Sequence, residues 1–384
     1  MKIAFYAPMK APTDPVPSGD REIARLLLRA LGEAGHEVLL ASAFRSWEGH
    51  GDGERQRRLR DLGQRLADRL LRRFLAQPVD KRPQLWFTYH LYYKAPDWLG
   101  PRVSKALGIP YVAAEASYAP KRAHGLWALG LNAARAAISQ SDVVIALKSY
   151  DIPCLLPLLD DPRRLRTIKP FLDTRDYSIG ADQRTARRNR LAHRFDLDTT
   201  LPWLLTVAMM RPGNKLRCYR VLARALQRVT DRRLCLLVVG DGPARGDVEA
   251  AFGVATHHRI VFAGLQSPRA LQDFYAAADL FVWPAVDEPF GMALLEAQAA
   301  GLAVVAGRSR GVPDVVMDQL SGVLVAPDDA AAFAQAVTTL CNNPRRRCEM
   351  GAAARHRAQQ EHDIRAAGAA LDRILRQARE RATP

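Results

Sequence analysis

The stretch DLFVWPAVDEPFGMALLEAQAAGLAVVA, residues 279–306, decides the fold of this chain. Its first apolar run ends at Pro284, because proline cannot donate to a strand ladder, and the loop that follows carries Glu288. The Ala, Leu, Glu and Gln content that comes next predicts a helix from about Gly291 to Gly301. A second apolar run then follows. The stretch therefore predicts one βαβ unit of a parallel sheet.

This unit also predicts a ligand-binding site. Open parallel sheets bind ligands at the carboxyl ends of their strands, and the free N–H groups of a helix start attract phosphate. We expect the backbone of Gly291, Met292 and Ala293 to supply those groups, with Glu288 just in front of them. Glu296 lies two turns along the helix on roughly the same side, so one carboxylate can reach a sugar and the other a ribose. A solvated surface position is the alternative for Glu296.

The segment Glu288-Pro-Phe-Gly-Met-Ala-Leu-Leu-Glu296, with Ala-Gly-Leu-Ala-Val-Val at 300–305, resembles the E-x7-E signature of retaining glycosyltransferases of family four. The resemblance is densest from about Val238 to Pro327. It implies the α/β GT-B fold, in which two doubly wound Rossmann-like domains face each other across a cleft. It also implies sugar transfer from a nucleotide-diphosphate sugar, with no metal and no other cofactor.

Further donor contacts follow from the resemblance. Family members hold the leaving diphosphate with an arginine and a lysine after the first strand of the nucleotide domain. Lys215 falls on the lysine, but a gapless alignment puts Met210 on the arginine, so Arg211 is the expected substitute. Gly240 opens a glycine turn beside the nucleotide. Leu265 follows a strand at the place where similar proteins meet the base.

Two more donor positions come from loops. Phe290 belongs to the E-x7-E loop, and Gly19 stands where similar proteins have a glycine-rich loop under the diphosphate. This chain keeps one glycine there where two neighbours are usual. A plain strand-to-helix turn is the alternative for Gly19.

Two strand ends supply candidates on the acceptor side. Apolar runs at 85–89 and 111–114 deliver His90 and Glu115 to the carboxyl edge of a first sheet. The family usually has a histidine after the second of these strands, but this chain reads Ala114-Glu115-Ala116-Ser117. A purely structural role is the alternative for His90.

The length of 384 residues suits two domains, each able to bury its own core. We expect an acceptor-side domain at 1–172, a nucleotide-sugar domain at 173–358, and a C-terminal helix at 359–384 that crosses back to the first domain. The boundary falls in a run rich in Pro, Asp and Gly. Asp196-Leu-Asp198 lies in a loop that leads into a strand rather than out of one, so we interpret it as capping and not as a metal site.

A basic helix is predicted at 53–76. Five apolar residues repeat at helical spacing and are flanked by eight arginines: Leu59, Leu62, Leu66, Leu70 and Phe74, with Arg55, Arg57, Arg58, Arg60, Arg65, Arg69, Arg72 and Arg73. The helix can pack on the first sheet, and it can dock on an anionic membrane surface. We expect the leucines to pack inward and the arginines to act by charge. The formal net charge of +16 attracts polyanions in general. Basic residues are not interleaved with exposed aromatics and no helix-turn-helix is evident, so we expect no nucleic acid partner.

Composition narrows the class of protein. Hydrophobic residues make up 48%, and no apolar run is long enough to span a bilayer. The chain opens on a strand rather than on a signal-type segment, which predicts a cytoplasmic protein, peripheral at the inner face of the membrane if the basic helix docks there. Five cysteines without a CxxC pair argue against a disulfide framework and against a zinc knuckle.

These features predict a retaining, metal-independent hexosyltransferase that uses a nucleotide-diphosphate sugar. The expected acceptor is a glycan or a lipid-linked molecule in cell-envelope polysaccharide or glycolipid synthesis. A nucleotide-sugar epimerase of the same fold, a basic nucleic-acid-binding protein and an inactive scaffold are the alternatives. Transfer of the sugar, rather than its isomerisation, separates the first prediction from the epimerase.

Overall fold

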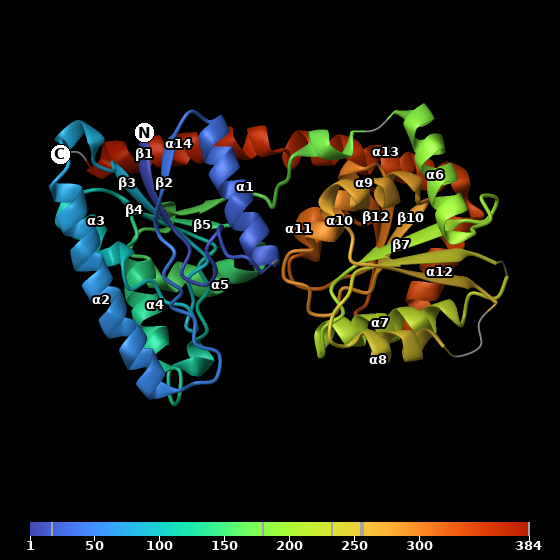
Figure 1. Ribbon diagram of the computed structural model, residues 1–384, viewed down its shortest axis with the longest axis horizontal. Coiled ribbons are helices and arrows are strands. Elements are labelled where there is room, and N and C mark those ends of the chain that lie inside the picture. Colours follow the sequence, from blue (N-terminus) through green and yellow to red (C-terminus); the bar gives the residue numbers. More distant parts are fainter. Residues whose placement is uncertain (17, 179, 232, 254–256, 383–384) are drawn as a thin grey trace. The chain divides into compact units, whose positions relative to one another are not determined.

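The computed structural model describes residues 1–382 except 17, 179, 232 and 254–256. The chain forms two compact α/β units (Figure 1), of which unit 1 comprises Met1–Lys169 and Ile364–Pro384 and unit 2 comprises Pro170–Asp363. The sequence suggested boundaries after residues 172 and 358. The units divide after Lys169 and Asp363 instead.

Unit 1 is built on a parallel six-stranded sheet in the order β2-β1-β3-β4-β5-β6. Its strands are β1 (Lys2–Tyr6), β2 (Glu37–Ser42), β3 (Leu85–Tyr89), β4 (Tyr111–Ala114), β5 (Val143–Ala146) and β6 (Leu165–Thr167). Every residue of β3, β4 and β5 is buried. Strands buried on both faces read as continuous apolar runs, which explains why these three were visible in the sequence.

Six α-helices belong to the described part of unit 1: α1 (Gly19–Glu33), α2 (Gly53–Leu75), α3 (Gly100–Leu107), α4 (Ala128–Gln140), α5 (Ile152–Leu155) and α14 (Ile364–Ala382). Helix α14 packs on α1, and a Cβ at Gly368 would lie 2.8 Å from the carbonyl oxygen of Ala30. Asp372 of α14 also lies 3.3 Å from the His36 ring. The C-terminal helix is thus part of the packing of unit 1.

Unit 2 has a second parallel six-stranded sheet, in the order β12-β11-β10-β7-β8-β9. Its strands are β7 (Trp203–Val207), β8 (Cys235–Val239), β9 (Arg259–Gly264), β10 (Leu280–Trp283), β11 (Ala303–Gly307) and β12 (Gly322–Val325). Leu280 of β10 pairs in parallel with Ala303 of β11. The βαβ unit predicted from residues 279–306 is therefore confirmed.

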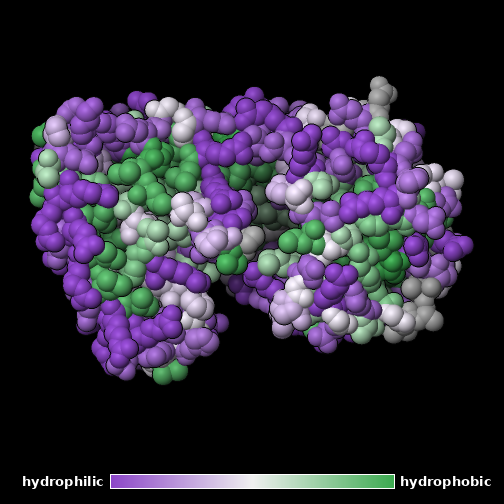
Figure 2. Space-filling view, viewed as in Figure 1, coloured by the Kyte–Doolittle hydropathy of each residue, from purple (hydrophilic) through white to green (hydrophobic). Residues whose placement is uncertain are grey.

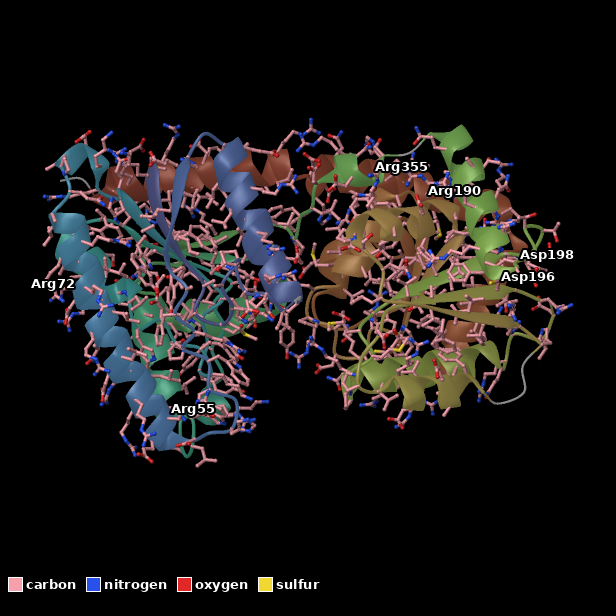
Figure 3. The ribbon with its side chains drawn as sticks, viewed as in Figure 1. Arg55, Arg72, Arg190, Asp196, Asp198 and Arg355 are labelled. Atoms are coloured by element: carbon pink, nitrogen blue, oxygen red, sulfur yellow. The ribbon has the colours of Figure 1, made fainter. Side chains whose placement is uncertain are left out.

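The α-helices in the described part of unit 2 are α6 (Ala181–Phe195), α7 (Asn214–Leu226), α8 (Arg245–Phe252), α9 (Pro268–Ala277), α10 (Met292–Ala299), α11 (Val312–Val315), α12 (Ala330–Asn342) and α13 (Pro344–Glu361). Both sheets are parallel and lie among helices, which is the predicted doubly wound α/β class (Figure 1). Asp196 is the C-cap residue of α6, whereas Asp198 Oδ1 accepts from the backbone N–H of Thr200 at 2.8 Å in the turn before β7. Asp196 and Asp198 lie together in the loop after α6 (Figure 3).

Helix α2 begins and ends close to the predicted bounds, but its buried face differs. The buried residues are Gln56, Gly63, Ala67, Leu70 and Phe74. Leu62 is 39% exposed, so the expectation that it packs inward is wrong. Small residues at 63 and 67 occupy the inner face because Trp98 packs there, and a Cβ on Gly63 would come within 2.4 Å of the Trp98 Cβ.

Among the helices of the described residues, none combines the length and the apolar character that crossing a membrane requires. The five cysteines are free thiols, and three of them are buried.

Candidate active site

The loop from β10 to α10 holds an unusual backbone. Ala285 and Asp287 adopt left-handed conformations with φ of 53° and 56°. Such conformations cost free energy in non-glycine residues and cluster at functional sites. Gly291 is the N-cap of α10, with φ of 73°, so the helix begins where the sequence predicted.

Lys215 and Glu288 meet at the carboxyl edge of the second sheet. The Lys215 Nζ donates to Glu288 Oε2 at 2.6 Å. The Trp283 Nε1 donates to the same oxygen at 3.1 Å, and the ammonium lies 5.2 Å from the Trp283 ring centroid. The Glu288 side chain is 13% exposed and that of Lys215 is 34% exposed. Two residues predicted from distant parts of the chain thus form one partly buried ion pair beside an indole.

A second set of contacts ties the same loop to its neighbours. Asn214 Nδ2 donates to Asp287 Oδ2 at 2.8 Å, and the Arg310 guanidinium contacts the Asp287 carboxylate. Arg310 follows β11 and is left-handed, with φ of 37°. The loops after β7, β10 and β11 therefore converge through charged side chains. Arg310 lies just after a strand, and that position in the sequence could have predicted that it belongs to the site.

The positions of Met210 and Arg211 differ sharply. Met210 is buried, and its backbone is bonded to Asp241 and Ala244. Arg211 is exposed, and its guanidinium makes no hydrogen bond or ion pair with any residue that the structure describes. Arg211 is thus a cation in the β7–α7 loop that remains open to a ligand, and its substitution for the family arginine stays a prediction.

The glycine turn after β8 has a clear steric cause. Gly240 has φ of 138°, and a Cβ on it would lie 1.9 Å from the Ala208 carbonyl oxygen. Gly242 has φ of 155°, and its Cβ would lie 2.3 Å from the Met210 carbonyl oxygen. Both glycines let this turn pack directly against the loop that carries Arg211. The turn therefore positions the β7–α7 loop, and its contact with the donor stays a prediction.

Glu296 is held by a tyrosine that the sequence did not reveal. The Tyr275 hydroxyl donates to Glu296 Oε2 at 2.6 Å. Burial, followed by the charge of Glu296, raises the pKa of Tyr275 well above its ordinary value. Tyr177 packs edge-on against Tyr275 with ring centroids 5.8 Å apart. Glu296 is half-buried, so the alternative of a fully solvated position is wrong.

The remaining donor candidates differ in their surroundings. Phe290, Met292 and Ala293 are half-buried around the start of α10, whereas Leu265 is 76% exposed after β9. Gly19 is the first residue of α1, and a Cβ there would meet nothing within 4 Å. The backbone thus gives no steric reason for a glycine at position 19.

The first sheet carries its own charged cluster. His90 and Glu115 directly follow β3 and β4, and both are left-handed, with φ of 59° and 56°. His90 Nδ1 lies 2.9 Å from Asp20 Oδ1. Glu115 is buried and pairs with Lys148, whose Nζ also lies 3.1 Å from Asp151 Oδ2. Burial raises the pKa of Glu115, and the charge of Lys148 opposes that effect.

The sequence identified His90 and Glu115 but missed their partners. Lys148 comes two residues after β5, so the strand-end rule that selected Glu115 could have selected it as well. Asp20 lies in the first turn of α1. No group of three or more His, Cys, Asp and Glu side chains suited to a metal ion occurs among the described residues.

Comparison with known proteins places the strongest similarity in unit 2. Residues 202–343 match the family described as Glycosyl transferases group 1. A D-inositol 3-phosphate glycosyltransferase of Corynebacterium kroppenstedtii is 31% identical over 204 residues, which cover 50% of this chain and 43% of that relative. A GDP-mannose-dependent alpha-(1-6)-phosphatidylinositol monomannoside mannosyltransferase of Mycolicibacterium smegmatis is 32% identical over 253 residues, or 63% and 64% of the two chains. The alignments thus span 43% and 64% of these curated relatives.

Solved structures resemble the chain over its whole length. HepE of Anabaena, solved in complex with UDP, has a TM-score of 0.72 at 16% identity, over 98% of this chain and 100% of that chain. A sucrose-phosphate synthase from Thermosynechococcus elongatus has a TM-score of 0.73 at 21% identity, over 98% of both chains. These likenesses establish the fold. The chain has the predicted GT-B fold, and residues 202–343, which include Lys215 and the E-x7-E segment, are similar to the group 1 glycosyl transferases.

Proposed function

We propose that this chain is a retaining, metal-independent glycosyltransferase that moves a sugar from a nucleotide-diphosphate sugar to a glycan or lipid-linked acceptor, in cell-envelope polysaccharide or glycolipid synthesis. The observation that carries the proposal is the Lys215–Glu288 pair in front of α10, with Glu296 on that same helix. The family match over residues 202–343 supports the transferase class. The relatives named for inositol phosphate and phosphatidylinositol mannoside support the acceptor class.

The demanding part of such a reaction is the departure of the diphosphate. Negative charge grows on the leaving group while positive charge grows on the sugar carbon, so fixed cations beside the diphosphate stabilise the transition state. An ammonium group has three N–H donors. Lys215 can therefore bind a phosphate oxygen while it keeps its bond to Glu288. Arg211 and the N–H groups at the start of α10 supply further positive charge.

The two acids of the signature have separate tasks in this proposal. Both bonds that fix Glu288 reach Oε2, so Oε1 can accept a hydrogen bond from a sugar hydroxyl. Glu296, held by Tyr275, accepts from a ribose hydroxyl. Charge-assisted hydrogen bonds of this kind orient the donor more strongly than neutral ones.

No covalent nucleophile is needed for retention. The acceptor hydroxyl attacks from the face that the diphosphate leaves, and a phosphate oxygen takes its proton. The new bond joins the acceptor oxygen to the sugar carbon as the bond to the diphosphate oxygen breaks. The cluster of His90, Glu115 and Lys148 offers hydrogen-bonding groups for a polyhydroxylated acceptor.

Product analysis tests the proposal. The purified chain is incubated with UDP-, GDP- or ADP-sugars and with D-inositol 3-phosphate or a phosphatidylinositol mannoside as trial acceptors. We expect a glycoside with the anomeric configuration of the donor, formed equally well with a chelator present. An inverted product would contradict retention, and activity lost to the chelator would contradict metal independence. An epimerised donor without transfer would replace the proposal by the epimerase.

A further inference from the structure

A recess in unit 2 lies at the opposite end of the sheet from the candidate active site. It is lined by Leu201 and Pro202, which precede β7, and by Asp279, which precedes β10. The carboxyl ends of those same strands lead to Lys215 and Glu288. Two adjoining pockets of about 610 Å³ and about 470 Å³ form the recess and share three lining residues. These volumes fall in the range of roughly 300–1,000 Å³ that is usual for small-molecule sites.

The charge of the recess is strongly one-sided. Its lining includes five arginines and one acid, Asp279, a balance of five minus one, or +4: Arg184, Arg188, Arg233, Arg347 and Arg355. Asp279 is already engaged, because its Oδ2 lies 3.0 Å from the Arg188 guanidinium and accepts the Trp203 N–H at 2.8 Å. The other four arginines form no ion pair with a described carboxylate, although the charge of Asp279 also acts on Arg184.

Backbone carbonyls hold these arginines in place, including Arg233, which donates to His257. Arg184 donates to Ala278 at 3.2 Å, Arg347 to Leu340 at 2.9 Å, and Arg355 to Ala300 at 3.0 Å. A guanidinium has five N–H donors, so each bond orients the group and leaves most of its donors available. The recess is therefore lined by cations that are already positioned.

Arg355, labelled in Figure 3, reaches the recess from α13. Its Nε is buried and has no hydrogen-bond partner in the part of the chain that the structure describes. The side chain lies against Gly301, where a Cβ would come within 2.5 Å of the Arg355 Nη2. Glycine at position 301 thus permits the approach that brings this guanidinium into the recess.

The arginines also repel one another. Burial, followed by the charge of Arg355, lowers the pKa of Arg184. Positive charges gathered without acids are costly unless an anion joins them. Planar guanidinium forks match phosphate oxygens in pairs.

We propose that this recess is a second anion site, which binds a phosphate-bearing small molecule or headgroup apart from the proposed sugar donor. A phosphate there would bond to α6 through Arg184 and to α13 through Arg347 and Arg355 at once. The chemistry is shared by free phosphates and by anionic lipid headgroups.

Calorimetric titration of the full chain with inorganic pyrophosphate tests this site. We expect Arg347→Gln with Arg355→Gln to weaken the binding by about tenfold or more, since both substitutions remove charge-assisted hydrogen bonds to the anion. The matched control is Arg224→Gln with Arg373→Gln, which removes the same charge from exposed positions on α7 and α14 and should bind as the parent does. The comparison is repeated in a Lys215→Ala background. If the two recess substitutions weaken pyrophosphate binding in that background as well, their effect is independent of the donor site. If Lys215→Ala alone leaves pyrophosphate binding unchanged, that result counts against the proposed function and not against the recess.

A second arm uses sedimentation with phosphatidylglycerol vesicles. Loss of vesicle binding in the recess variant alone would support the site and identify a headgroup as its ligand, whereas loss of pyrophosphate binding alone would support it and identify a free phosphate. Equal binding of parent and recess variant in both arms would overturn it. If the glutamine variant does not fold, Arg347→Lys with Arg355→Lys keeps the charge and removes the planar forks. A several-fold weaker pyrophosphate affinity is then expected, and an unchanged affinity would overturn the site.

Discussion

Glu115 is a buried acid whose charge depends on Lys148. Removing one partner of a buried ion pair typically costs about 3–5 kcal/mol, because the other charge stays buried and unpaired. We therefore expect Lys148→Met to lower the free energy of unfolding by about that amount at neutral pH. Chemical denaturation of the parent and of the variant measures the difference.

The loss should depend on pH. Burial raises the pKa of Glu115, so as pH falls the folded state takes up this proton before the unfolded state does. The stability that Glu115 contributes through its raised pKa is therefore present at low pH, and it is lost as pH rises and the folded carboxyl ionises. Lys148→Met should raise this pKa further, so its cost should shrink from about pH 8 to about pH 5. Lys148→Met with Glu115→Gln should recover most of the loss, and a pH-independent cost would count against an uncompensated charge.

Gly240 offers a second test on a single residue. A Cβ there would lie 1.9 Å from the Ala208 carbonyl oxygen, so the two loops must separate in Gly240→Ala. We expect a loss of roughly 2 kcal/mol or more in unfolding free energy, in the upper part of the usual range. Gly246→Ala is the control, because a Cβ at that helical position meets nothing within 4 Å. Equal midpoints for the two variants in thermal unfolding would refute the steric account.

Lys215 and Arg211 should matter for turnover. Lys215→Ala should lower kcat by roughly a hundredfold or more, the scale found when one preorganised partner of a developing anion is removed. Arg211→Ala should act similarly, since its exposed guanidinium is open to the diphosphate. Steady-state kinetics with the active donor measures kcat for both variants, and Arg224→Ala serves as the control. Full activity in Arg211→Ala would leave the diphosphate to Lys215 and the backbone amides.

Individual residues differ in how far the sequence revealed them. The resemblance to the E-x7-E family pointed to Lys215 and Glu288, and the structure brings the two side chains into contact. Their direct contact was not predictable, since it depends on Trp283 and on the left-handed turn before Glu288. Tyr275 escaped notice because an apolar helix position gives no sign of a hydroxyl partner.

At the scale of elements, α2 presents a charged outer surface. Arg57, Arg65, Arg69 and Arg72 are exposed and make no ion pair with any described residue. Hydrophilic colour covers the part of unit 1 where α2 lies (Figure 2), and Arg55 and Arg72 extend outward from the helix (Figure 3). The exposed apolar side chains nearby include Leu62, Leu75 and Val79. Exposed arginines beside exposed apolar side chains favour docking of α2 on an anionic membrane surface over docking on another protein.

Vesicle sedimentation tests this surface. Each arginine near an anionic leaflet is worth about 1 kcal/mol, so the parent should bind anionic vesicles at low salt and release them as salt rises. Replacing Arg57, Arg65, Arg69 and Arg72 by glutamine should abolish that binding. A control with four exposed arginines replaced elsewhere, Arg220, Arg224, Arg345 and Arg373, should keep it. Indifference of the parent to anionic lipid, or full binding by the α2 variant, would make this helix an ordinary surface.

The inner face of α2 shows what periodicity cannot supply. The spacing of large apolar residues predicted the helix itself. It could not show that Gly63 and Ala67 face inward, because that choice depends on the bulk of Trp98 on a separate segment. The space that a neighbouring segment leaves for a side chain is set by the folded structure and is not visible in the spacing of the sequence.

At the scale of the whole molecule, the architecture was predictable for a physical reason. Parallel strands buried on both faces appear as apolar runs, such as 111–114 and 303–306, and helices separate them in regular order. The exact ends of the two units were harder to predict from the sequence. Leu172 pairs with Asp363 in a bridge inside unit 2, and a contact between residues so far apart in sequence leaves no local sign.

The central claim is that unit 2 binds a nucleotide-diphosphate sugar through α10, and thermal unfolding tests it directly. One of the UDP-, GDP- or ADP-sugars should raise the unfolding midpoint of the parent, because a ligand at about a hundred times its Kd stabilises the folded state by about 2.7 kcal/mol. Glu296→Ala should lose most of this shift, as the missing hydrogen bond to a charged group costs on the order of 2 kcal/mol, while the exposed control Glu349→Ala should keep it. A parent whose midpoint stays the same with every one of these sugar nucleotides, or a Glu296→Ala variant that responds as fully as the parent, would contradict the account.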